Sequence, residues 1–167
     1  MKALSLDSIN AQAAYLVVAG ESQSGTFLFS TVSGNDYAIS FNEDMEIAGC
    51  LSYQFVIRRL NNHISGHDPK IQITIMAIID EFFRQNQDIL LYTCDTEDRK
   101  EAARNRLFIR WFKEAESSSN FVLKTADTVV EGQGFYFAII VPKSHPNLAA
   151  ICSEFDTVAE NLSQKPE

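Results

Sequence analysis

The residue pair best placed for covalent chemistry is Cys94-Asp95, which lies at the end of the apolar run Asp88–Cys94. Ligands often bind at the carboxyl end of a central strand, and a thiol beside a helix N-terminus can have a lowered pKa. A nucleophilic cysteine also needs a base, for which His63 and His67 are the candidates. The alternative, which we favour, is a buried strand cysteine followed by a helix-capping aspartate. We therefore treat Cys94 and Asp95 as a candidate cleft and assign no catalytic residue.

The histidines and cysteines do not follow the spacing of a metal site. His63 and His67 are four residues apart, which suits a metal only on a helix, and Gly66 and Pro69 favour a loop there. The three cysteines are far apart, and no CxxC pair occurs among them. The sequence therefore predicts no metal site, no disulfide framework and free thiols, as in an intracellular protein.

A row of basic side chains on a predicted helix is not needed to build the hydrophobic core, so it is a candidate binding surface. Arg99, Arg106, Arg110 and Lys113 follow one another at spacings of seven, four and three, which places them on one face of a predicted helix over Thr96–Ser117. Such a row can bind an anion, RNA or the acidic surface of a protein partner. The alternative is a solvated face paired with the acidic N-terminal half, in which each surface pair contributes about 0–1 kcal/mol.

The charge balance limits the classes of partner. The net charge is −8, and residues 1–50 hold six acidic residues against the single basic residue Lys2. Phosphate repulsion from this acidic body disfavours nucleic acid and anionic membranes. No apolar run approaches the roughly 20 residues that span a bilayer, and the N-terminus does not resemble a signal peptide. We expect a cytoplasmic protein whose partner is another protein or a second copy of the chain.

The hydrophobic pattern predicts one α+β domain over residues 1–167, with a mixed, mostly antiparallel sheet and helices packed on it. Residues 1–25 are ambiguous, because residues 1–20 fit a short helix or a strand, and residues 163–167 form a tail. Asn42–Cys50 is predicted to be an acidic connection. The predicted strands are Thr26–Val32, Tyr37–Phe41, Leu51–Leu60, Asp88–Cys94, Phe121–Val130 and Phe135–Val141, and the predicted helices are Asp68–Gln85, Thr96–Ser117 and Leu148–Leu162.

The order of these elements over Thr26–Val141 resembles the core of the GNAT acyltransferase fold. The resemblance implies acetyl-CoA as a cofactor, with its pyrophosphate held by a glycine-rich loop at the start of the first core helix. The matching stretch, IRRLNNHISGHDPK, supplies Arg58, Arg59 and Gly66 as candidate cofactor-loop residues. It has one glycine where that family has a pair, and Asp68 at the helix start. An acyl-CoA-dependent N-acyltransferase relative is the alternative function.

The stretch DILLYTCDTEDRKEAARNRLFIRWF resembles a group of small uncharacterised proteins of Bacteroidetes. In that group a YxCD strand end is followed by an RxxLFxxWF helix, and a segment similar to DPKIQITIMAIIDEFF precedes both. This resemblance covers most of the chain and implies no established activity. We therefore predict a soluble binding or interaction module of an uncharacterised family, and leave open whether it is an enzyme.

Overall fold

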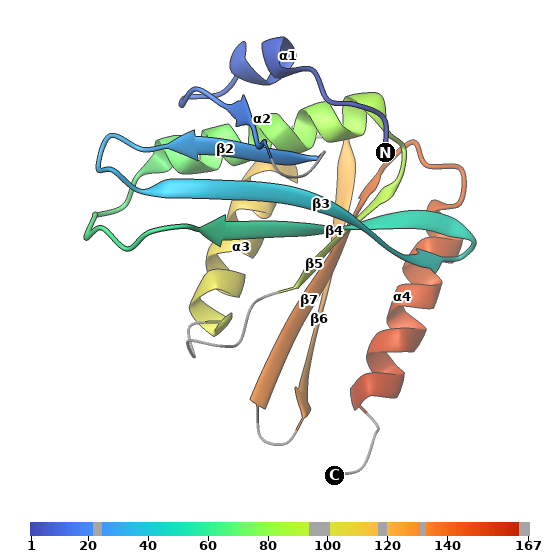
Figure 1. Ribbon diagram of the computed structural model, residues 1–167. Helices are drawn as coiled ribbons and strands as arrows, with labels where there is room; N and C mark the ends of the chain where they lie inside the picture. Colours follow the sequence, from blue (N-terminus) through green and yellow to red (C-terminus); the bar gives the residue numbers. More distant parts are fainter. Residues whose placement is uncertain (22–24, 94–100, 117–119, 131–132, 164–167) are drawn as a thin grey trace. The chain divides into compact units, whose positions relative to one another are not determined.

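The computed structural model describes residues 1–21, 25–93, 101–116, 120–130 and 133–163 (Figure 1). Its helices are α1 (Leu6–Asn10), α2 (Pro69–Gln85), α3 (Glu101–Glu116) and α4 (Leu148–Ser163). Its strands are β1 (Val18–Ala19), β2 (Thr26–Ser30), β3 (Asp36–Ile47), β4 (Cys50–Arg59), β5 (Ile89–Thr93), β6 (Phe121–Val130) and β7 (Gln133–Pro142). The strands follow the order β1-β2-β3-β4-β5-β7-β6 in a mixed, mostly antiparallel sheet, which confirms the predicted α+β class.

The predicted start of a helix at Asp68-Pro69 is confirmed by the structure. The helix α2 begins at Pro69, and the Asp68 side chain caps it by accepting a hydrogen bond from the Lys70 N–H. Proline suits the first helical position because its missing N–H has no partner there anyway. The N-terminal segment contains both of the structures that its sequence allowed, the short helix α1 capped by Ser5 and the short strand β1.

The prediction of an acidic connection over Asn42–Cys50 is wrong. Strand β3 continues to Ile47, and β4 begins at Cys50 after a two-residue turn. Both turn residues, Ala48 and Gly49, have positive φ angles of 50° and 70°, as a tight antiparallel hairpin requires. Burial of Ile47 explains the longer strand, because this side chain is 5% exposed and belongs to a core cluster that the local sequence does not reveal.

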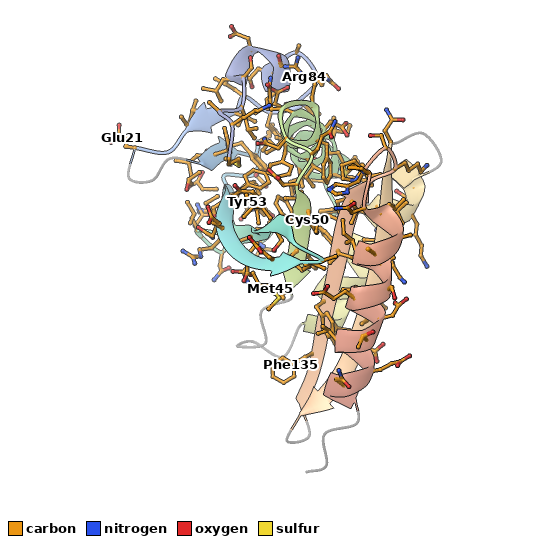
Figure 2. The ribbon with its side chains drawn as sticks, turned by 90° about the vertical axis from the view of Figure 1, so that its right-hand side faces the viewer. Glu21, Met45, Cys50, Tyr53, Arg84 and Phe135 are labelled. Carbon is orange, nitrogen blue, oxygen red and sulfur yellow. The ribbon has the colours of Figure 1, made fainter. Side chains whose placement is uncertain are left out.

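The chain forms two compact units, and the first consists of Met1–Asn42 and Phe55–Gln87. Its core includes Phe82 of α2, whose ring stacks on Phe41 of β3 with centroids 4.9 Å apart. Glu81 is only 3% exposed and accepts hydrogen bonds from the Ser5 N–H, Arg84 and Gln85. Arg84, which is labelled in Figure 2, also donates a hydrogen bond to the Ser8 hydroxyl of α1. These bonds attach the N-terminal segment to α2.

The second unit consists of Glu43–Gln54 and Asp88–Glu167. Strands β5, β7 and β6 pair antiparallel within it, and helices lie on both sides of them, as Figure 1 shows for α3 and α4. Because side chains alternate along a strand, β5 contributes to two packed layers. One is the cluster of Ile47, Ile89, Ile139, Val141, Ile151 and Phe155, which includes α4. The other stacks Tyr92 against Phe108 of α3.

Candidate functional site

Aromatic packing fixes the orientation of α3. The rings of Tyr92 and Phe108 stack with centroids 3.5 Å apart, and those of Phe112 and Phe121 lie 5.4 Å apart. Phe108 and Phe112 are 2% and 0% exposed. Since one face of the helix is held by these contacts, the opposite face is directed to solvent.

The solvent-directed side of α3 carries three of the four predicted basic residues. Arg106, Arg110 and Lys113 are exposed, and together with Ile109 and Glu114 they line one open, shallow groove. We call Arg106, Ile109, Arg110 and Lys113 the α3 face. Helical spacing places these five groove residues on one side of α3, and Arg99, the fourth residue of the predicted row, lies outside the described residues.

The cations of the α3 face are little used by the fold. The Arg110 Nε lies 3.9 Å from Glu114 Oε1, and both side chains are more than half exposed, at 58% and 57%. A surface pair with this geometry contributes about 0–0.5 kcal/mol. Arg106 and Lys113 make no hydrogen bond or ion pair with the described residues.

Arg59, a candidate cofactor-loop residue, is already bonded inside the chain. Its guanidinium donates to Asn35 Oδ1, with a Nε–Oδ1 distance of 3.0 Å, and to the His63 carbonyl. Arg58 is exposed at the end of β4, and no atom lies within 4 Å of a Cβ built on Gly66. No hydrogen bond or ion pair among the described residues therefore joins Arg58, Arg59 and Gly66 into one binding site.

The start of α2, where the resemblance would place the pyrophosphate, is occupied by a carboxylate. Asp68 Oδ1 accepts from the Lys70 N–H at 3.0 Å, and Asp68 Oδ2 accepts from the Tyr15 hydroxyl at 2.5 Å. The bond to Asp68, together with partial burial, raises the pKa of the Tyr15 phenol above its ordinary value. A negative group at a helix N-terminus occupies the position that a bound phosphate would take.

The remaining predicted site residues, Cys94, Asp95 and Arg99, lie outside the described residues. The two described cysteines, Cys50 and Cys152, are free thiols with intermediate exposure. Within the described part of the chain, no group of three His, Cys, Asp or Glu side chains is arranged to hold a metal ion. None of the described helices is long and apolar enough to cross a bilayer.

The β3–β4 hairpin is a second surface, and the sequence interpretation missed it. Its exposed residues include Glu43, Asp44 and Glu46, with the apolar Met45 and Leu51 at 60% and 41% exposure. Figure 2 shows Met45 at the hairpin, with its side chain directed away from the strands. The alternation from Phe41 through Met45 to the buried Ile47, followed by Ala-Gly, was the signal available in the sequence.

Two contacts hold the hairpin to α4. The Ala48 N–H donates to Glu154 Oε2 at 2.8 Å, and the Asn147 side-chain amide lies 3.4 Å from the Cys50 sulfur. Ser52 also donates to the Met45 carbonyl within the hairpin. Glu43, Asp44 and Glu46 are therefore exposed on a hairpin that is fixed by hydrogen bonds.

Residues 67–157 match a family described as a family of unknown function (DUF6169), and this match covers more than half of the chain. No curated protein and no solved structure matches the chain. The prediction of an uncharacterised family is confirmed. The GNAT resemblance and the acetyl-CoA that it implies receive no support from these comparisons.

Proposed function

The chain belongs to the DUF6169 family, whose function is unknown, and we propose that it is a binding module that docks an acidic protein segment on the α3 face. The proposal assigns no reaction to the chain. It includes a cytoplasmic location, which the free thiols of Cys50 and Cys152 favour.

One observation carries the proposal: Arg106 and Lys113 lie exposed on one helix face without a partner among the described residues, whereas Arg59, Arg84 and Lys124 are bonded within the chain. Arg59 is bonded to Asn35, Arg84 to Glu81, and Lys124 to Asp156. Aligned, unpaired cations on a rigid helix raise the local positive potential and attract an anionic surface. The α3 face is therefore the best supported binding surface of the described chain.

The composition of the groove favours protein over nucleic acid. Ile109 adds an apolar contact between the cations, which a phosphate backbone does not use. The net charge of −8 adds a long-range repulsion against a polyanion that extends beyond the groove. A short segment that combines acidic and apolar side chains matches both properties of the groove.

A peptide-binding assay tests the proposal. The probe is a fluorescein-labelled ten-residue peptide that alternates glutamate with serine and leucine, and the readout is fluorescence anisotropy at low salt. We expect saturable binding that weakens as NaCl rises, and at least a tenfold loss of affinity in R106E/R110E, about 1.4 kcal/mol. Arg58→Glu, an exposed charge reversal on β4, is the control.

Two results would contradict the proposal. One is binding of the acidic peptide that R106E/R110E leaves unchanged. The other is a single-stranded RNA oligonucleotide that binds the wild-type chain more tightly than the peptide does, since that would make the face a nucleic-acid site.

A further inference from the structure

We infer that the acidic segment that docks on the α3 face is the β3–β4 hairpin of a second copy of this chain. The inference rests on the proposed docking role of α3 and identifies the partner at that site. It is argued from the charge, apolar content and spacing of two surfaces that both belong to the second compact unit.

The hairpin presents two acids and a leucine on one face. Asp44 and Glu46 are two residues apart on β3, so their side chains lie on the same face of the strand. The two-residue turn between Ile47 and Cys50 places Glu46 opposite Leu51, and opposite residues of an antiparallel pair share a face. All three side chains are exposed. We call Asp44, Glu46 and Leu51 the hairpin face.

The hairpin face matches the α3 face in kind and in spacing. Residues two apart on a strand are separated by about 6.8 Å, the position of Asp44 relative to Glu46. Residues four apart on a helix are separated by about 6 Å along the axis, the position of Arg106 relative to Arg110. The two carboxylates can therefore meet the two guanidiniums together. Leu51, at 41% exposure, then supplies an apolar surface for Ile109.

The two faces do not satisfy each other within one chain. Asp44 and Glu46 make no ion pair with any described residue, and neither does Arg106. Every copy carries both faces on opposite sides of the second unit, so copies can associate head to tail, with the hairpin face of one on the α3 face of the next. We therefore expect reversible head-to-tail self-association.

Sedimentation velocity of the 167-residue chain is the first measurement. In 20 mM NaCl we expect the weight-average mass to rise with protein concentration above the 18.7 kDa of the monomer. In 500 mM NaCl we expect the monomer to predominate, because salt screens exposed ion pairs. A mass that stays at that of the monomer up to millimolar concentration at low salt overturns the inference.

Charge exchange is the decisive test of the contact. The hairpin variant D44K/E46K and the helix variant R106E/R110E each juxtapose like charges, so each alone is expected to be monomeric. Their equimolar mixture, and the single chain that carries all four substitutions, again juxtapose opposite charges and are expected to associate as the wild type does. Recovery in both samples supports the contact, and failure of recovery while each variant retains the wild-type circular dichroism spectrum contradicts it.

Two controls separate this inference from the proposed function. Glu160→Lys, an exposed reversal on α4, should leave the mass distribution unchanged. The hairpin variant D44K/E46K retains its α3 face, so it should still bind the acidic probe peptide. A wild-type chain that binds this peptide but stays monomeric contradicts the second-copy partner alone, whereas loss of peptide binding in every sample contradicts the docking role itself.

Discussion

The arginine of the Asn35 cluster and the arginines of the α3 face differ in whether they are hydrogen-bonded within the chain. In the first compact unit, Arg59 is bonded to the buried Asn35 and to a loop carbonyl. On the α3 face, Arg106 has no partner among the described residues, and Arg110 has only a 3.9 Å contact with Glu114. A charge that is bonded to other groups of the chain stabilises the fold, whereas an exposed and unpaired row is available to a partner. The number of arginines alone does not make this distinction.

Asn35 is the centre of the cluster to which Arg59 belongs. It is 0% exposed, and its amide oxygen accepts from Arg59 and from the His63 N–H. Its amide nitrogen donates to Ser33 and to Ser65. The turn between β2 and β3 is therefore tied to the loop that leads into α2.

The largest effect is expected for Asn35→Ala. This change removes the bonds of a buried side chain to Arg59, His63, Ser33 and Ser65 together, which should lower the free energy of unfolding by about 3 kcal/mol. Urea denaturation at neutral pH measures it. A loss below about 0.5 kcal/mol would show that the cluster does not support the fold and would remove the basis of the comparison.

Glu81→Gln tests how much the buried carboxylate of Glu81, in the same unit, stabilises the fold. Burial raises the pKa of Glu81, but the bonds from Ser5, Gln85 and Arg84 outweigh this effect, so the pKa of the carboxyl lies below its ordinary value. Replacing the carboxylate removes charge-assisted bonds and should cost about 2 kcal/mol at pH 7.

The pH dependence of that cost has a defined sign. A carboxyl whose folded pKa is lowered stabilises the fold above its unfolded pKa, and this stabilisation is lost as pH falls through the folded pKa. The difference between wild type and Glu81→Gln should therefore shrink on acidification below the ordinary glutamate range. A difference that grows as pH falls would contradict the assignment.

The sequence predicted those parts of the structure that depend on local rules. The Asp68-Pro69 start of α2 follows from capping chemistry, and the orientation of the α3 row follows from helical spacing. The Asn35 cluster was not predicted, because Arg59 lies 24 positions away and Ser65 lies 30 positions away. No local pattern shows which arginine has a partner that is distant in the sequence.

The extended β3–β4 hairpin was missed for a related reason. Three acidic residues suggested a solvated loop, but the strand is held by Ile47, whose partners in the core are supplied by β5, β7 and α4. The turn also uses Ala48 at a positive φ angle, where asparagine or glycine is the usual signal. Tertiary packing and the contact of Ala48 with Glu154 stabilise this conformation.

Ala48→Gly is expected to raise the free energy of unfolding, by less than Asn35→Ala and Glu81→Gln lower it. Alanine at a φ of 50° is strained, and glycine relieves this strain but gives the unfolded chain more conformational freedom. The net result should be a gain of about 0.5 kcal/mol in the free energy of unfolding. Thermal unfolding measures it, and a clear loss would show that packing of the Ala48 methyl group matters more than its backbone strain.

The smallest effect on stability is expected on the α3 face itself. Arg106→Ala should change the free energy of unfolding by less than about 0.5 kcal/mol, because no bond to the described residues is lost. Urea denaturation of Arg106→Ala and Asn35→Ala, measured side by side, compares their free energies of unfolding directly. A loss of 2 kcal/mol or more in Arg106→Ala would show that the fold uses this charge.

The most direct test of the docking role is a titration of the ¹⁵N-labelled 167-residue chain with the acidic probe peptide, followed by amide chemical shifts. The account predicts that the largest shift changes fall on residues 106–114 and that they diminish at high salt. Shift changes that concentrate on residues 58–68, or no changes at millimolar peptide, would contradict it.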